Sequence, residues 1–328
     1  MSQNQNTNRN IIVTGAAGYI GGTICIELKK RGYKVYAIDR RDIEHLRRYY
    51  DESLCNDFTD YEAMRMYKRA NPAAIIHCAG TSLVGPSMKA PGIYFHNNVA
   101  RTNTLLNYVI NECPQTKVIF SSSAAVYGNP ATRTLDENQP TKPMSPYGES
   151  KLMVEQMLKW FNVAYGLKYI AFRYFNACGA DPHGKHGQEP NATHIFAKIF
   201  EAVRKDSMFT IHGSDYPTED GTCIRDYIHV TDLAEAHIMA IENDAEGVYN
   251  LGTLKGTSNL EVYNAVCDKL DKKLPVMFDK KREGDPAILI ADSTKWQQKT
   301  GWTPKYTMSD IVEHLNIWYN TGTFRNLK

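Results

Sequence analysis

The architecture of this chain is encoded most clearly near its start, in the segment Asn10-Ile11-Ile12-Val13-Thr14-Gly15-Ala16-Ala17-Gly18-Tyr19-Ile20-Gly21. Its first part is apolar and predicts a short buried strand. The three glycines that follow predict a tight turn that brings the backbone close to a ligand. From Thr23 to Lys30 the pattern is helical, and Gly32 closes it. A strand, a glycine turn and a helix in this order predict a dinucleotide-binding unit, although the spacing differs from the standard Gly-x-Gly-x-x-Gly.

A second strand follows this helix and leads to an acidic residue. It covers Lys34 to Ile38, and Asp39 comes directly after it. In dinucleotide-binding units the helix N-terminus offers N–H groups to phosphates, and an acid at this position accepts hydrogen bonds from the adenosine ribose. We therefore predict that Asp39 favours NAD. Arg40 and Arg41 could attract a 2′-phosphate, so NADP stays open.

Strands and helices alternate through the first half of the chain. Beyond the first two strands, we predict strands at 73–79, 117–123 and 168–173, and helices at 95–112 and 147–165. Such alternation indicates an α/β protein, with a parallel sheet covered by helices on both faces. Ligands of such sheets lie beyond the carboxyl ends of the strands. We therefore predict one site from the residues at these strand ends, which are Gly15, Asp39, Ala79, Gly80, Ser123 and Asn176.

A catalytic pair is indicated by Tyr147 and Lys151, which lie four residues apart on a predicted helix and so face the same side. An isolated tyrosine titrates near pH ~10. A fixed ammonium group lowers the pKa of the phenol and makes it a general acid or base for a hydroxyl. Ser123, the last of three consecutive serines, would hold the same hydroxyl. Because Tyr-x-x-x-Lys also arises by chance, the pair gains weight from the glycine turn in the same predicted unit.

The composition narrows the class of protein. The chain has 328 residues, of which 42% are hydrophobic, enough for one large or two modest domains with a packed core. A net charge of +2 gives no reason to expect nucleic acid or a membrane surface as a partner. No apolar stretch is long enough to span a bilayer, and residues 1–9 are polar, unlike a signal peptide. The dispersed cysteines predict a cytoplasmic protein without a disulfide framework.

No metal site is expected. His183 and His186 lie in a glycine-rich loop without a third candidate ligand nearby, which favours solvent-exposed loop histidines. His77 lies in an apolar predicted strand and is expected to be a hydrogen-bonded core residue rather than a base.

The pattern changes near residue 177, where irregular segments appear at 179–187 and 213–222. Long loops in compact enzymes often bind substrates. We therefore predict a dinucleotide-binding domain at 9–176, with a returning segment near 226–250, and a mostly substrate-binding domain at 177–328.

Together these motifs resemble those of the UDP-glucose (UDP-galactose) 4-epimerases, a family of extended short-chain dehydrogenases/reductases. The similarity extends from about Asn10 to the C-terminal helix. The matching segments are Thr14–Gly21, Ser121–Gly128, Ser145–Gly148, Arg173–Asn176, Asp215–Thr222, Arg225–Val230 and Arg282–Asp285. The resemblance implies a Rossmann-type doubly wound parallel sheet and a smaller C-terminal α/β domain that binds a UDP-sugar.

The resemblance also implies a set of site residues. The catalytic residues would be Ser123, Tyr147 and Lys151. Tightly bound NAD would contact Gly15, Gly18, Tyr19, Ile20, Gly21, Asp39, Asp57, Phe58, Ala79, Gly80, Asn97, Tyr147, Lys151 and Tyr174. The UDP-sugar would contact Ser123, Asn176, His194, His212, Arg225, Arg282 and Asp285. The two arginines would bind its diphosphate, since guanidinium groups match phosphate oxygens.

The implied activity is reversible epimerisation at C4 of UDP-galactose or UDP-glucose through a 4-keto intermediate. Tyr147 would take the proton of the 4-hydroxyl while hydride passes to NAD, and hydride would return to the other face of the sugar. The resemblance further implies a homodimer formed by the helices at 95–112 and 147–165.

Four alternative functions are weighed against the residues. A UDP-N-acetylhexosamine 4-epimerase is open, because Leu289 is of intermediate size where the family controls the sugar pocket. A UDP-pentose 4-epimerase is open, because the sequence says little about the rest of that pocket. Ala124 and Ala125 stand where related dehydratases carry an Asp-Glu pair, which argues against elimination chemistry. A non-catalytic NAD-binding regulator would be expected to lose Tyr147 or Lys151, and both are present.

Overall fold

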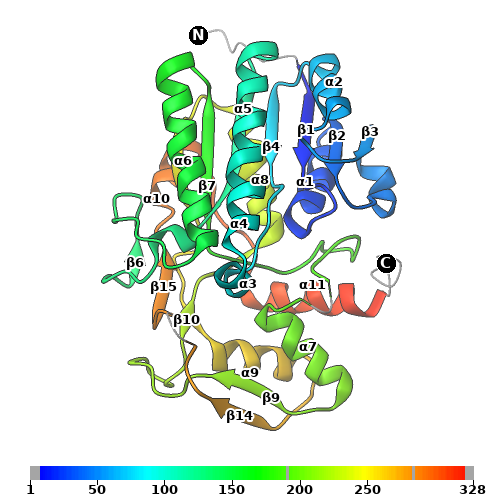
Figure 1. The fold of residues 1–328 in the computed structure, drawn as a ribbon. Helices are drawn as coiled ribbons and strands as arrows, with labels where there is room; N and C mark the ends of the chain where they lie inside the picture. Colours follow the sequence, from blue (N-terminus) through cyan, green and yellow to red (C-terminus); the bar gives the residue numbers. More distant parts are fainter. Residues whose placement is uncertain (1–7, 190–191, 283–284, 322–328) are drawn as a thin grey trace. The chain divides into compact units, whose positions relative to one another are not determined.

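The structure is a computed structural model and describes residues 8–189, 192–282 and 285–321 (Figure 1). Residues 283 and 284 of the Arg282–Asp285 motif and the first seven residues of the polar N-terminus lie outside this range. The chain forms two compact units, each considered by itself. Unit 1 comprises Met1–Gly128, Thr141–Arg173 and Ala234–Tyr249, and unit 2 comprises Asn129–Pro140, Tyr174–Leu233 and Asn250–Lys328.

In the described residues, unit 1 is built on a seven-stranded sheet in the order β12-β7-β5-β4-β1-β2-β3. β1 pairs in parallel with β2 and β4, β2 with β3, and β4 with β5. This arrangement confirms the predicted α/β class with a doubly wound parallel sheet. The strands are β1 (Asn10–Thr14), β2 (Lys34–Asp39), β3 (Glu52–Cys55), β4 (Ala74–His77), β5 (Lys117–Ser123), β7 (Tyr169–Tyr174) and β12 (Gly247–Leu251).

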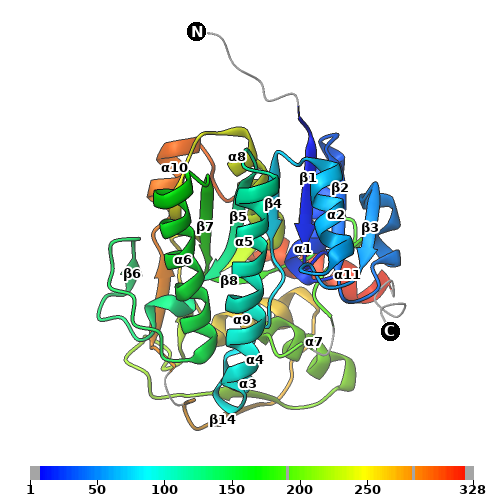
Figure 2. The same ribbon diagram turned by 45° about the horizontal axis from the view of Figure 1, so that its top comes forward.

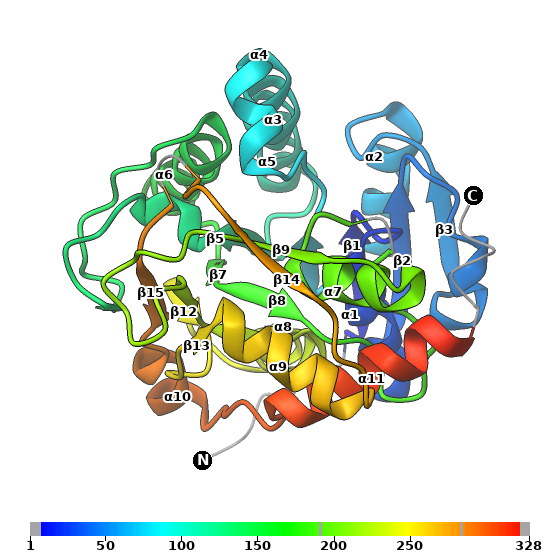
Figure 3. The same ribbon diagram turned by 90° about the horizontal axis from the view of Figure 1, so that it is seen from below.

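Helices cover both faces of this sheet. Figure 3 shows α2, α5 and α6 along one face and α1 and α8 along the other. The same layering is visible from above in Figure 2. The helices are α1 (Tyr19–Lys30), α2 (Tyr61–Ala70), α3 (Val84–Lys89), α4 (Pro91–Tyr94), α5 (Arg101–Glu112), α6 (Pro146–Tyr165) and α8 (Val230–Glu242). Shorter helical turns are η1 (Glu44–Tyr49), η2 (Phe95–Ala100) and η3 (Ala124–Tyr127).

Local chemistry explains where α6 begins and ends. The side chain of Ser145 accepts a hydrogen bond from the backbone N–H of Gly148, and Pro146 occupies the first turn, where it loses no intrahelical bond. The helix ends at Gly166, whose φ of +69° suits a residue without a Cβ. These signals agree with the predicted helix at 147–165 to within one residue.

The predicted helix at 95–112 is divided in the structure. Phe95–Ala100 forms a π-helical turn, and α5 begins at Arg101. Within this turn Asn98 accepts from the backbone N–H of Thr81 at 2.7 Å and donates to the carbonyl oxygen of Thr81 at 3.0 Å. The wide turn lets one side chain bond to the strand-end loop, and such turns often occur at functional sites.

Unit 2 combines small sheets with helices. Its strand orders, within the described residues, are β13-β10-β15-β6, β11-β8 and β14-β9. The strands are β6 (Thr134–Leu135), β8 (Asn176–Cys178), β9 (Phe209–His212), β10 (Ile224–Arg225), β11 (Tyr227–His229), β13 (Thr257–Ser258), β14 (Val276–Asp279) and β15 (Ile288–Ala291). The helices are α7 (Ile195–Lys205), α9 (Asn259–Lys269), α10 (Thr294–Thr300) and α11 (Met308–Thr321).

The core of unit 2 is formed by buried residues of α7, α9 and α11, among them Phe196, Val262, Leu315 and Trp318. Residues 129–140 belong to this unit because β6 pairs in parallel with β15.

Across the described part of the chain, no helix is both long and apolar enough to cross a bilayer.

Candidate active site

The glycine turn between β1 and α1 has no room for side chains. Gly15 has a φ of +73°, and a Cβ there would lie 2.6 Å from the backbone nitrogen of Ala79. A Cβ on Gly21 would lie 2.2 Å from the carbonyl oxygen of Gly15. Only glycine therefore lets the turn pass directly against the end of β4 and lets α1 pack on the turn. This is the geometry that a loop cradling a pyrophosphate requires.

The N-terminus of α1 suits a negatively charged ligand. Its N-cap residue, Gly18, makes no side-chain cap, and its first turn contains no acidic residue. The positive end of the helix dipole is therefore not offset by a carboxylate of this helix. Tyr19 and Ile20 are its first two residues. The predicted phosphate-binding residues thus share one turn, and this turn fits the diphosphate of a dinucleotide.

Asp39 is fixed beside the glycine turn. Its Oδ2 accepts a hydrogen bond from the backbone N–H of Ala17 at 3.0 Å, and its Oδ1 accepts from that of Arg41 at 2.9 Å. The Nε of Arg41 lies 3.7 Å from Oδ1. The carboxylate of Asp39 is therefore fixed against the glycine turn, and Arg41 lies beside it.

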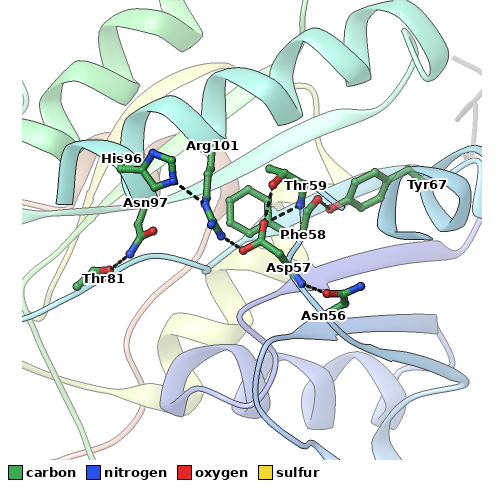
Figure 4. Close-up of polar contacts among 9 residues, drawn as sticks. All are labelled: Asn56, Asp57, Phe58, Thr59, Tyr67, Thr81, His96, Asn97 and Arg101. Carbon is green, nitrogen blue, oxygen red and sulfur yellow. Dashed lines mark hydrogen bonds and ion pairs between the residues drawn. The ribbon is translucent and has the colours of Figure 1, made fainter. Parts of the chain in front are cut away.

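Asp57, which follows β3, is held by bonds from two directions (Figure 4). Its Oδ1 accepts from the N–H of Thr59 at 3.0 Å and from its hydroxyl at 2.6 Å. Its Oδ2 forms an ion pair with Arg101 at the start of α5. The Nε of Arg101 also donates to His96 at 3.4 Å. Sequence reasoning named Asp57 for the adenine but missed Arg101, since the two lie 44 residues apart.

The residues predicted beyond β4 also come together. The N–H of Ala79 donates to the hydroxyl of Thr14 at 3.3 Å, and Asn97 donates to the hydroxyl of Thr81 at 2.8 Å. A Cβ on Gly80 would lie 3.6 Å from the Nζ of Lys151. Phe58 is buried, and its ring centroid lies 4.8 Å from that of His77.

His77 is a buried core residue, as predicted. It is hydrogen-bonded to the hydroxyls of Thr14 at 2.7 Å and of Thr102 at 3.0 Å. Burial, together with the charge of Lys151, lowers the pKa of His77 to about 3. The imidazole is therefore neutral at neutral pH and takes no part as a proton carrier.

The structure brings Ser123, Tyr147 and Lys151 together at the carboxyl end of β5. The hydroxyl of Ser123 is hydrogen-bonded to Tyr147. The Nζ of Lys151 lies 5.9 Å from the centre of the Tyr147 ring and donates to the carbonyl oxygen of Ser121 at 2.8 Å. Lys151 is buried, whereas Tyr147 is half-buried. A phenol, a hydroxyl and an ammonium group thus converge in unit 1, which also holds the glycine turn.

The pKa values of Tyr147 and Lys151 are shifted in directions that the sequence did not lead us to expect. Burial raises the pKa of Tyr147, and its hydrogen bond with Ser123 lowers it. Burial lowers the pKa of Lys151 to about 8, while the charges of Cys78 and Glu155 raise it. The expectation that Lys151 depresses the pKa of Tyr147 is therefore wrong for the protein alone. The cost of burying a phenolate prevails, because the ammonium group lies over the ring and bonds to a carbonyl oxygen.

The residues predicted to bind the UDP part of a substrate lie in unit 2. Arg225 ends β10 and donates to Oδ1 of Asp285 at 2.7 Å. The N–H of Asp285 donates to the carbonyl oxygen of the exposed Arg282 at 3.2 Å. Asn176 begins β8. His212 ends β9, where its Nδ1 lies 3.6 Å from a carboxylate oxygen of Asp279.

His194 is the most suggestive of these residues. It precedes α7, and its ring stacks on Phe196 with centroids 5.8 Å apart. Both ring nitrogens are buried and have no hydrogen-bond partner among the described residues. Burial lowers its pKa to about 4. Because buried polar groups are normally satisfied, a neutral imidazole of this kind fits a site for a polar ligand group.

A buried ion pair lies one helical turn beyond Lys151 and was not predicted from the sequence. Glu155 of α6 and Arg173 of β7 are both buried and are joined by a 2.7 Å contact. Spacing could have placed Glu155 on the helix face of Tyr147 and Lys151, since it lies eight and four residues beyond them, but it gives no sign of Arg173.

Among the described residues, no group of three or more metal-ligating side chains is present. His183 is exposed, but the expected exposure of His186 is wrong, because its ring is buried beside that of Trp318, with centroids 6.2 Å apart.

The sheet, the glycine turn and the Ser-Tyr-Lys constellation define a dinucleotide-binding α/β protein equipped for proton transfer. Comparison with known proteins makes the assignment specific. The chain belongs to the NAD dependent epimerase/dehydratase family, whose model matches residues 11–252. The resemblance predicted from the motifs is thereby confirmed.

Individual relatives are similar over nearly their whole length. The UDP-glucose 4-epimerase of Halalkalibacterium halodurans is 41% identical, over 94% of this chain and 95% of that one. The solved UDP-glucose 4-epimerase of Brucella ovis in complex with NAD has 36% identity and a TM-score of 0.88, covering 94% and 98% of the two chains. That of Bifidobacterium longum with NAD⁺ and UDP has 34% identity and a TM-score of 0.88, covering 95% and 98%.

Proposed function

We propose that this chain is an NAD-dependent UDP-glucose 4-epimerase, which interconverts UDP-galactose and UDP-glucose through a 4-keto intermediate. The observation that carries the proposal is the convergence of Ser123, Tyr147 and Lys151 at the end of β5, in a member of this family. The glycine turn and Asp39 in the same unit supply the elements that a dinucleotide needs.

The residues of unit 1 would hold the cofactor along its length. The N-terminus of α1 would hold its diphosphate, Asp39 its adenosine ribose, and Asp57 and Phe58 its adenine. Lys151 would bind the nicotinamide ribose. The bound cofactor would supply reversible hydride transfer at C4 of the sugar, with no net oxidation. The positive charges of Lys151 and of oxidised NAD would offset the burial that raises the pKa of Tyr147.

The protein would move the proton and hold the substrate. Tyr147 takes the proton of the 4-hydroxyl at its phenolate oxygen and later returns it, while Ser123 holds the same sugar oxygen. From unit 2 we assign Arg225, Arg282 and Asn176 to the diphosphate. The uridine is assigned to His194, His212 and Asp285. These polar and charged residues would thus hold the nucleotide part of the substrate. The sugar would remain free to rotate about its diphosphate linkage.

The decisive experiment is incubation of the purified protein with UDP-galactose, followed by chromatographic identification of the product. UDP-glucose is the expected product. UDP-GalNAc and UDP-arabinose, tested in parallel, decide between this activity and the N-acetylhexosamine and pentose alternatives. A protein that retains NAD but converts none of the three sugars would refute the proposal and favour the regulator.

Asp39→Ala is expected to weaken NAD binding. The carboxylate is the acceptor assigned to the adenosine ribose, and losing charge-assisted hydrogen bonds costs about 1.5–3 kcal/mol, or roughly 10- to 100-fold in Kd. NAD retained after dialysis is measured by its absorbance. Asp42→Ala, an exposed acid three residues away, is the control and should retain NAD. Equal occupancy in both variants would contradict the assignment of Asp39.

We also propose a cytoplasmic homodimer. The proposal is supported by large apolar side chains exposed on one side of α6, namely Met153 (38%), Trp160 (67%) and Val163 (67%), which are seven and three residues apart. An exposed patch of this kind is typical of a protein interface. The cysteines of the described residues are all free, as expected of a reducing compartment. Sedimentation velocity tests the dimer, and a single species at 37.1 kDa would contradict it.

A further inference from the structure

A second set of contacts joins the end of β5 to α6 next to the catalytic residues. The Nζ of Lys151 donates to the carbonyl oxygen of Ser121 at 2.8 Å, and the hydroxyl of Ser122 donates to Oε1 of Glu155 at 2.5 Å. These two serines precede the catalytic serine directly. Three consecutive residues of β5 are therefore bonded to α6, through helix positions 147, 151 and 155. Because these positions are four residues apart, they line one face of the helix.

Glu155 belongs to a fully buried ion pair. Its side chain is 4% exposed, and that of its partner Arg173 is 7% exposed. The Nη2 of Arg173 donates to Oε2 at 2.7 Å and its Nε donates to Oε1 at 3.0 Å. Its Nη1 donates to the hydroxyl of Tyr127 at 2.9 Å. Burying two charges is costly, and their attraction offsets the cost only where the geometry is good and further hydrogen bonds are made. Arg173 bonds to both oxygens of Glu155 and to Tyr127, yet apolar side chains could fill the same space without the cost of burying charge.

The two charges of the ion pair are placed differently relative to Lys151. Glu155 lies one helical turn from Lys151, whereas Arg173 reaches Glu155 from the neighbouring strand β7. The other titratable groups that interact with Lys151 are His77 and Cys78 of β4 and the segment after it, and Tyr147 lies one turn away on α6. Glu155, which is paired with Arg173, is the carboxylate among the groups around Lys151. Its charge favours the ammonium form of Lys151, which burial disfavours.

We propose that Glu155 is a positioning residue of the catalytic site. Its carboxylate, which forms an ion pair with Arg173, accepts the hydrogen bond of Ser122 and so fixes the end of β5 against α6. The negative charge of the carboxylate also keeps Lys151 in its ammonium form. This inference rests on the proposed function, because the charge of Lys151 matters for turnover only if Tyr147 is the acid and base.

The test is the dependence of kcat on pH in Glu155→Gln. Glutamine keeps the shape of the side chain and a hydrogen bond for Ser122. It removes the negative charge of Glu155 and leaves the positive charge of Arg173 without its partner. Lys151 should then lose its proton more easily, so the alkaline limb of the profile should move to lower pH by about one unit. KM for UDP-galactose and NAD occupancy should change little.

The double variant Glu155→Gln with Arg173→Met separates charge from packing. It removes the cation that repels Lys151 in the single variant, so its alkaline limb should lie closer to that of the unmodified protein. A role in packing alone predicts no such recovery. Ser122→Ala, which leaves both charges in place, should lower kcat about fivefold without moving the limb. It serves as the independent test if the single variant does not fold, and an unchanged kcat would then overturn the proposal.

The outcomes distinguish this inference from the proposed function. An alkaline limb that is the same in Glu155→Gln as in the unmodified protein, or that moves as far in the double variant as in the single one, overturns the role of Glu155 alone. Retained turnover in Tyr147→Phe, measured alongside, overturns the assignment of Tyr147 as acid and base and this inference with it, whereas the proposed function is overturned only if the unmodified protein converts none of the UDP-sugars.

Discussion

Replacing Tyr147 with phenylalanine is expected to lower kcat for UDP-galactose by about 10³-fold while leaving UDP binding nearly unchanged. General acid–base catalysis contributes typically ~10²–10⁴-fold, and the substitution removes only the oxygen that carries the proton. The ring remains to fill its place beside Tyr94, whose centroid is 6.4 Å away. Initial rates give kcat, and calorimetry with UDP gives the binding constant. A fall in kcat without a change in binding identifies a group that acts in the transition state.

Tyr94→Phe is the matched control for this experiment. Tyr94 is a buried neighbour of Tyr147, and its hydroxyl donates to the carbonyl oxygens of Ser82 and Leu83 at 3.0 Å and 2.8 Å. Deleting this phenol oxygen should cost stability, on the order of 1 kcal/mol, but little turnover. If Tyr147→Phe kept more than about a tenth of the activity, or if both variants lost it equally, the proton would have to be carried by another group.

Much of the fold of unit 1 could be predicted because its signals are local. The predicted strand at 117–123 has the observed bounds, and the predicted helix at 147–165 differs by one residue from α6. Apolar runs, the cap at Ser145 and the glycine at 166 carry this information. The division of the helix at 95–112 could not be predicted, because the π-helical turn lies where Asn98 bonds to Thr81, 17 residues away in the sequence.

The same distinction applies to the site. Tyr147 and Lys151 are four residues apart on one helix, so their proximity could be read from the sequence. The partners of Asp57 and Glu155 could not, because Arg101 and Arg173 reach them only through the order of strands in the sheet. The predicted direction of the pKa shift of Tyr147 was wrong for a related reason. Spacing shows which charges are near a phenol, but the cost of burying it depends on everything packed around it.

Gly15→Ala is expected to abolish NAD binding and to destabilise unit 1 severely. The added Cβ would lie 2.6 Å from the backbone nitrogen of Ala79 and 2.8 Å from the carbonyl carbon of Cys78. Backbone atoms cannot rotate away as a side chain can, so either the turn or the end of β4 has to move. We expect a loss of more than about 3 kcal/mol in the free energy of unfolding, beyond the cost of the left-handed conformation itself.

Gly32→Ala separates these two costs. Gly32 has a φ of +74°, nearly that of Gly15, but a Cβ there would have no neighbour within 4 Å. Its variant should lose only about 1–2 kcal/mol, the cost of a left-handed alanine, and should keep its NAD. Urea unfolding and NAD occupancy are measured for both variants. Similar losses in the two would mean that backbone conformation, rather than the close approach of the turn to β4, accounts for the glycine at position 15. The cofactor cradle would then tolerate a side chain there, contrary to the packing described above.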